Sequence, residues 1–192
     1  MDTSAYLEGI IKQFTYYKSL GEKTINQVEE SQLFWQYNEN TNSIAIIVNH
    51  LWGNMLSRWT NFLTEDGEKE WRQRDAEFED TIKTKEELLT KWNEGWDCLF
   101  DALHSITPEN MDTPIYIRNV EHTITEAIYR QLAHYAYHVG QIVHIGKTIK
   151  DDQWVSLSIP KGGSKAYNAN RFAQPKHKAH YTDNLLKEDD KA

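Results

Sequence analysis

The sequence contains a single cysteine, Cys98, so no disulfide can form within the chain. One lone thiol fits a reducing compartment. The beginning of the chain lacks the basic region and the apolar run of a secretory signal peptide, and no later apolar run approaches the length of a membrane span. We therefore expect a cytoplasmic protein that does not enter a membrane.

Basic residues are also few relative to acidic ones. The chain has 21 Lys and Arg and 29 Asp and Glu, which gives a formal net charge of -8. An acidic chain has little general electrostatic affinity for nucleic acid or for anionic membranes, so we expect neither as a partner. The serine-hydrolase elbow, the phosphate-binding P-loop and the dinucleotide fingerprint are all missing. Cys98 has no convincing catalytic partner in the sequence, so we expect it to be structural.

The length of 192 residues predicts one globular domain, spanning 1–192, with room for a sizeable core. Four segments have apolar side chains at three- and four-residue steps, which is typical of amphipathic helices. These segments are residues 4–28, 43–63, 84–104 and 125–150. The linkers between these segments have about ten to twenty residues, which fits a four-helix bundle and allows crossover connections. We predict an all-α fold with a short irregular C-terminal strap at 154–160 and a mobile tail from about 170 to 192.

Side chains at the predicted helix starts support these boundaries. Ser43 can cap the second helix, and the pairs Thr84–Glu87 and Thr123–Glu126 have the spacing of capping boxes. The third helix should bury its apolar stripe, including Trp92, Trp96, Leu99 and Phe100. Between the helices, 64–83 predicts a long charged loop with one short turn, and 111–122 predicts a small hairpin.

Histidines on two of these helices are the candidate functional residues. His134 and His138 are four residues apart in the fourth helix, which places both imidazoles on one face, one turn apart. His50 lies in the second helix, on a mixed polar and apolar stripe with Asn54 and Ser57. Three imidazoles can hold one metal ion and leave a coordination position open. Buried histidines bonded to carbonyl groups are the commoner alternative, and it stays open at this point.

Polar neighbours of these histidines are candidates for supporting roles. Gln141 follows His138 by one turn and can orient a ligand histidine or a bound water. Asn54 and Ser57 can contact a substrate, and ordinary buried hydrogen bonding is the alternative for all three side chains. His144 is offset from the face of the histidine pair by roughly a quarter turn, so it should point elsewhere. The sequence shows no glutamate beside the histidines that would serve as a general base.

Two segments resemble the DinB/YfiT-like superfamily of metal-dependent enzymes. They are Asn49-His50-Leu51 and the stretch from His134 to Ile142, HYAYHVGQI. The strap at 154–160 resembles a branch of that superfamily known as a domain of unknown function. The resemblance implies a four-helix bundle in which His50, His134 and His138 hold a divalent ion, with zinc, nickel or iron as candidates. It also implies a homodimer and, by analogy with some members, transfer of a low-molecular-weight thiol such as bacillithiol, mycothiol or glutathione.

Three functional hypotheses follow. The first is a metal-dependent enzyme with a three-histidine open site, a thiol S-transferase or a hydrolase acting on an electrophilic small molecule. The second is a non-catalytic protein of the stress response that binds a metal or a small ligand. The third is a structural dimer with a vestigial site.

Overall fold

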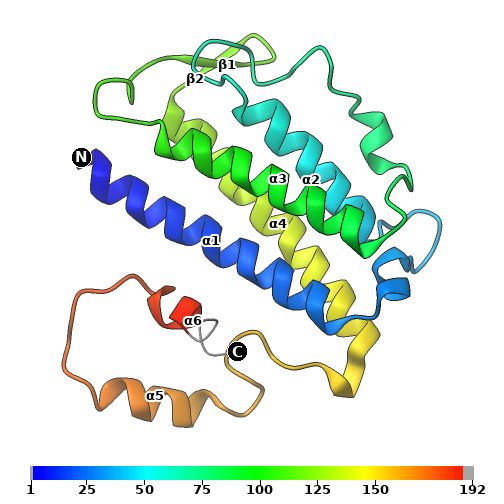
Figure 1. Ribbon diagram of the computed structural model, residues 1–192. Helices are drawn as coiled ribbons and strands as arrows, with labels where there is room; N and C mark the ends of the chain where they lie inside the picture. The colour runs from blue at the N-terminus through cyan, green and yellow to red at the C-terminus, as the bar shows by residue number, and fades with distance from the viewer. Residues whose placement is uncertain (1, 188–192) are drawn as a thin grey trace.

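Four long helices form the body of the computed structural model, which describes residues 2–187 (Figure 1). They are α1 (Thr3–Gln27), α2 (Ile44–Trp59), α3 (Lys85–His104) and α4 (Ile124–Lys150). The shorter elements are η1 (Glu30–Phe34), η2 (Asp75–Phe78), β1 (Ile115–Ile117), β2 (Val120–His122), η3 (Asp151–Gln153), α5 (Ser164–Phe172) and α6 (Asp183–Lys187). The predicted all-α bundle with an irregular C-terminal region is confirmed. Among the described residues, no helix is both long enough and apolar enough to cross a membrane.

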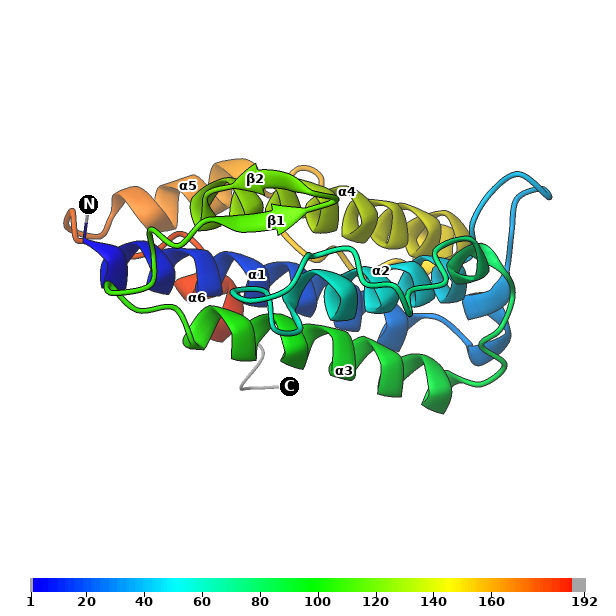
Figure 2. The ribbon, with the colours of Figure 1, turned by 90° about the horizontal axis from the view of Figure 1, so that it is seen from above.

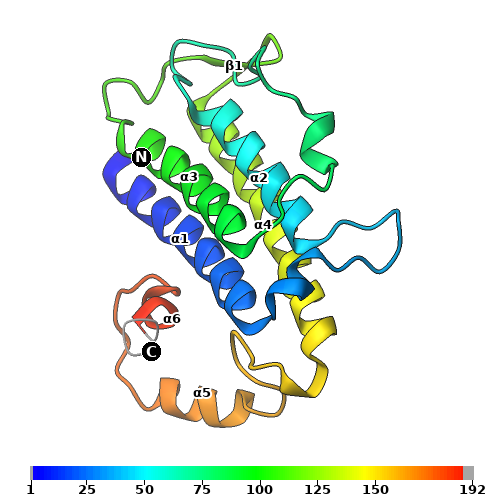
Figure 3. The ribbon, with the colours of Figure 1, turned by 45° about the vertical axis from the view of Figure 1, so that its right-hand side comes forward.

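The chain direction makes the connection between α2 and α3 a crossover. Figures 1 and 3 show α2 and α3 running in the same direction and α1 and α4 running in the opposite one. Residues 60–84 must therefore return along the length of the bundle before α3 begins. Figure 2 shows the crossover over α2 and the β1–β2 hairpin over the start of α4, on the same side of the bundle. The crossover is the segment that covers the candidate site.

The helix starts follow the predicted caps with one exception. The Ser43 hydroxyl accepts a hydrogen bond from the backbone N–H of the third residue in α2, and Thr123 and Glu126 form a complete capping box. Thr84 caps α3, but the Glu87 carboxylate accepts from the backbone N–H of Lys83 at 2.7 Å, so only half of that box exists. The predicted box was wrong in this half because Glu87 reaches one residue further back.

The second helix is shorter than predicted. It ends at Trp59, where residue 63 was expected, because Thr60 takes an extended conformation and Asn61 adopts a left-handed φ of 49°. Asparagine is one of the few residues that tolerate this conformation. The chain can therefore turn sharply into the crossover.

The core lies where the four helices meet, and aromatic side chains of α3 fill much of it. Trp92, Trp96 and Leu99 are buried, as predicted, but Phe100 is only partly buried. The prediction for Phe100 was wrong because this side chain lies at the edge of the apolar stripe of α3. Gly21 lies inside α1 because a Cβ there would come within 2.4 Å of the Trp92 ring. The glycine costs helix propensity and gives the indole its space.

The predicted hairpin is confirmed and is tied to the crossover. Its turn residues, Arg118 and Asn119, have φ values of 56° and 59°, as the tight turns of two-residue hairpins require. The carboxylate of Asp66 accepts hydrogen bonds from both of their backbone N–H groups at 2.8 Å. This contact fixes the start of the crossover against the hairpin.

The C-terminal part packs on the bundle through the strap and through α6. The Gln27 side chain bonds both backbone groups of Val155, and Lys12 pairs with Asp183 at 3.1 Å. Helix α5 buries none of its residues and stands apart from the four long helices in Figures 1 and 3. The predicted mobile tail from 170 to 192 stays a prediction, and its last residues, 188–192, lie outside the described part.

Candidate metal centre

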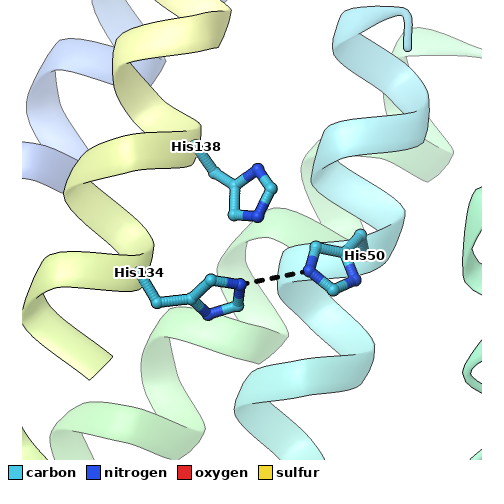
Figure 4. Close-up of side chains that lie close together, drawn as sticks. All are labelled: His50, His134 and His138. Atoms are coloured by element: carbon cyan, nitrogen blue, oxygen red, sulfur yellow. Dashed lines mark hydrogen bonds between the residues drawn. The ribbon is translucent and has the colours of Figure 1, made fainter. Parts of the chain in front are cut away.

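Three imidazoles from two helices meet in the bundle (Figure 4). His50 comes from α2, and His134 and His138 come from α4. The Nε2 atoms of His50 and His134 are 3.2 Å apart, and the potential ligand atoms of all three side chains lie within 4.8 Å of one another. Two nitrogens at about 2.0–2.1 Å from one tetrahedral ion are about 3.3 Å apart. The arrangement is therefore compatible with metal binding.

The helix that carries His50 is buried on nearly all sides. Of its 16 residues, 14 are buried, because the crossover and η2 cover the face that α3 and α4 leave open. A buried imidazole needs hydrogen-bond partners for its polar atoms. The crossover supplies the partner for His50.

That partner is Glu77, which the crossover places against His50. The Nδ1–H of His50 donates to Oε2 of Glu77 at 2.9 Å. Arg72 holds the same carboxylate with two hydrogen bonds, from Nε at 2.7 Å and from Nη2 at 2.9 Å. The side chains of all three residues are almost completely buried, at 5%, 6% and 2% exposure for His50, Glu77 and Arg72. Both oxygens of Glu77 are thus occupied, so it orients His50 and is not free to act as a base.

The hydrogen bonds of the imidazoles leave the correct nitrogens for a metal. His50 places its Nδ1 proton on Glu77, and His138 places its Nδ1 proton on the Oε1 atom of Gln141 at 2.8 Å. Each ring therefore keeps an unprotonated Nε2. Metal-binding histidines usually have this arrangement, in which the second nitrogen donates to a carboxylate or an oxygen that fixes the ring.

Burial also keeps the rings of His134 and His138 neutral. Burial lowers the pKa of His134 to about 3, and the neighbouring His138 and His50 add to this effect. Burial likewise lowers the pKa of His138 to about 4, although the hydrogen bond to Gln141 opposes the shift. Burial alone would raise the pKa of Glu77, but hydrogen bonds from His50 and Arg72 outweigh it and hold that pKa below its usual range. At neutral pH His134 and His138 are thus neutral, which is the form that binds metal, and the Glu77 carboxylate is ionised.

Asn54 and Ser57 are buried near the same end of α2 and are engaged in hydrogen bonds. The amide oxygen of Asn54 accepts from the hydroxyl of Tyr135 at 3.1 Å, which links α2 to α4. The hydroxyl of Ser57 donates to the carbonyl of Gly67 at 2.9 Å and accepts from the N–H of Lys69 at 3.1 Å. Asn54 therefore helps to join α2 to α4, and Ser57 helps to hold the crossover against α2.

His144 and Cys98 lie outside the cluster of three histidines. His144 lines a cavity on another side of α4. The Cys98 thiol has weak contacts with Thr60 and with the carbonyl of Met55, and burial raises its pKa. A thiol with a raised pKa is a poor nucleophile.

The comparison with protein families is consistent with this picture. A family model described as a protein of unknown function, DUF1572, matches residues 2–163. The chain belongs to this family. The match includes the four long helices, the three histidines and the strap at 154–160. A search of curated proteins found no match.

In this DUF1572 protein, Gly53 creates the space that Glu77 occupies. A Cβ on Gly53 would lie 2.4 Å from Oε1 and 2.8 Å from the carboxylate carbon of Glu77. That carboxylate is fixed by His50 and Arg72, so it cannot move aside cheaply. The glycine is therefore part of the support for His50.

Replacing Gly53 with alanine should destabilise the protein by about 1–3 kcal/mol, because the added methyl group overpacks the buried carboxylate. Alanine would otherwise be favoured inside a helix by about 1 kcal/mol. Urea unfolding followed by circular dichroism measures the change. Gly9→Ala is the matched control, since a Cβ there meets no atom within 4 Å, and it should stabilise the protein slightly. Equal effects of the two substitutions would contradict the role of Gly53.

Proposed function

We propose that this DUF1572 protein is a divalent-metal-dependent enzyme of the DinB/YfiT-like type. His50, His134 and His138 would hold the ion, with zinc, nickel or iron as candidates, and leave a position open. The observation that supports this most is the convergence of three imidazoles, two of which have their second ring nitrogen fixed by Glu77 or Gln141. Structural histidines need one partner each and have no reason to converge on a common point.

The proposed reaction is transfer of a low-molecular-weight thiol to an electrophilic small molecule. A divalent ion lowers the pKa of a thiol or water at its open position, so that a thiolate or hydroxide is available near neutral pH. In the transfer the sulfur forms a bond to the electrophilic carbon, the leaving group departs with its electron pair, and the thiol proton goes to solvent. Cys98, which is only partly buried, cannot be the thiol, because it lies beside Thr60, outside the histidine cluster, and has a raised pKa. The thiol must therefore be an external molecule.

Hydrolysis of the electrophile is less well supported than thiol transfer. A water must lose a proton to become a nucleophile, and a general base usually accepts it. The carboxylate that contacts the histidines, Glu77, already accepts three hydrogen bonds from Arg72 and His50. A thiol, with an ordinary pKa of about 8.5, needs much less help to ionise.

A non-catalytic role, as a stress-response protein that binds a metal or a small ligand, is the second candidate. The occupied state of Glu77 favours it, since a binding site needs oriented ligands and no base. Homodimer formation and a cytoplasmic location stay predictions. Light scattering at micromolar concentration tests the first of them.

The test is an activity assay with chlorodinitrobenzene as the electrophile and with bacillithiol, mycothiol and glutathione as separate thiols. The protein is loaded with zinc, nickel or ferrous iron and compared with metal-free protein. We expect product formation that requires both a thiol and a metal and that is lost in His138→Ala. Metal binding without product for any thiol would favour the non-catalytic role.

A further inference from the structure

A cavity of about 610 Å³ lies between α4 and the loop that precedes α2. Small-molecule sites usually have volumes of roughly 300–1,000 Å³. Trp35, Tyr37 and Tyr137 line it, with exposed fractions of 39%, 77% and 62%. Aromatic side chains are rarely left so exposed at one place on a protein unless they bind something.

The cavity adjoins the candidate metal centre through two residues of α4. Gln141 lines the cavity and accepts the hydrogen bond from His138. Tyr137 also lines it, and its ring centroid is 4.8 Å from that of His138. A molecule in the cavity would therefore contact two side chains that touch His138, one of the three candidate ligands.

The polar side chains that line the cavity include no carboxylate, ammonium or guanidinium group among the described residues. They are amide, hydroxyl and imidazole groups, including those of Asn40, Asn42, His144 and Thr148. Within residues 2–187, the cavity lining contains no Asp, Glu, Lys or Arg. An ionised ligand would lose hydration there without gaining a partner of opposite charge. The lining therefore favours an uncharged ligand.

Gly140 keeps the α4 wall of this cavity free of a side chain. It lies inside a helix of 27 residues, where glycine costs about 1 kcal/mol relative to alanine. Gly21, Gly53 and Gly146, also inside long helices, each have an atom within 2.4 Å of an added Cβ, which explains them by packing. An added Cβ on Gly140 meets no atom within 4 Å, so no packing contact explains this glycine. A larger side chain at this position would project into the cavity.

We propose that this cavity binds an uncharged small molecule with an aromatic or similarly flat apolar body. The further step rests on the proposed function: the bound molecule is the electrophile that receives the thiol. The aromatic side chains supply stacking surfaces, and the amides and hydroxyls supply neutral hydrogen bonds. The ligand class is thus set by ring contacts and by the lack of charged groups.

The experiment uses two dyes with the same ring skeleton. N-phenylnaphthylamine is uncharged, and anilinonaphthalenesulfonate carries one sulfonate. Fluorescence titration is done at high salt, so that the net negative charge of the chain is screened. We expect the uncharged dye to bind at least about tenfold more tightly than the sulfonate.

Variants of the cavity lining test whether the dye binds there. Gly140→Leu should weaken binding of the uncharged dye by at least about tenfold, whereas Gly9→Leu, the matched glycine of α1, should leave it unchanged. Tyr37→Ala is a second variant that removes an exposed cavity wall without touching the core, and it should also weaken binding. Circular dichroism checks that each variant is folded.

Zinc titration of the same proteins separates the two proposals. The cavity inference would be overturned if Gly140→Leu and Tyr37→Ala left dye affinity unchanged. If zinc binding were normal in the same proteins, the proposed function would still stand. Equal affinity for both dyes would overturn the assignment of an uncharged ligand. Dye binding that depends on Gly140 in a protein that binds no zinc would support the cavity and remove the proposed function.

Discussion

Replacing Glu77 with alanine should lower the free energy of unfolding by about 3–5 kcal/mol, which is the usual cost of removing one partner from a buried ion pair. The substitution would leave the guanidinium of Arg72, which is 2% exposed, with only Glu68 at 3.2 Å as an acidic partner. It would also remove the acceptor for the Nδ1–H of His50. Urea unfolding of the metal-free protein measures the change.

A matched control lies in the same crossover. Asp80 pairs with Lys83 at 2.9 Å, and both side chains are more than half exposed. Asp80→Ala should cost no more than roughly 1 kcal/mol, as exposed ion pairs usually do. An equally small loss in Glu77→Ala would show that the buried network contributes little to stability.

Replacing His138 with alanine should weaken zinc binding by more than about 100-fold, which exceeds the loss usually seen when a supporting hydrogen-bond partner is removed. The preformed pair on α4 is then lost, and His50 and His134 alone cannot complete the site. Titration calorimetry of metal-free protein with zinc measures the affinity. His144→Ala, a change of the same type on the same helix, should leave zinc affinity nearly unaltered, because His144 is outside the cluster. Similar losses in both variants would contradict the assignment of ligands.

The support for His50 can be tested separately from its ligand role. Glu77→Gln keeps the size of the side chain and removes its charge, so the fold should survive better than in the alanine variant. Carboxylates that orient a ligand histidine typically contribute 10- to 100-fold to metal affinity, and we expect about that loss. Comparing the two Glu77 variants thus separates the effect on the stability of the fold from the effect on metal affinity.

The fold was largely predictable because its signals are local. The three- and four-residue spacing defines each long helix, and the capping residues Ser43 and Thr123 mark two helix starts within one turn. Errors occurred where a local signal competes with a nearby alternative. The Glu87 carboxylate accepts from the backbone N–H of Lys83 and not from that of Thr84. Asn61 ends α2 early through a backbone conformation that spacing does not reveal.

The candidate site was predictable only in part. The pair on α4 shares one helix face, so its proximity follows from the sequence, while the addition of His50 depended on pattern and family resemblance. Glu77 was missed because it is 27 residues from His50, in a crossover without helical spacing. Its neighbour Arg72 gives no signal either, since a charged loop usually faces solvent. Only the folded arrangement shows that this loop turns a carboxylate into the bundle.

The crossover therefore both buries α2 and supplies a charged side chain to the candidate site. It covers α2, and its buried Glu77 places a negative charge against His50. This charge favours a cation at the site and lets the Arg72 guanidinium remain buried. The proposed thiol chemistry would depend on that cation, whereas ligand binding in the cavity can be tested without it.

The most direct test of the account is the metal content of the protein purified without an affinity tag, incubated with zinc and dialysed, as determined by elemental analysis. We predict about one zinc per chain in the wild-type protein and far less in His138→Ala. A wild-type protein that keeps no more metal than the His138→Ala variant would contradict the metal centre and the enzymatic function proposed from it.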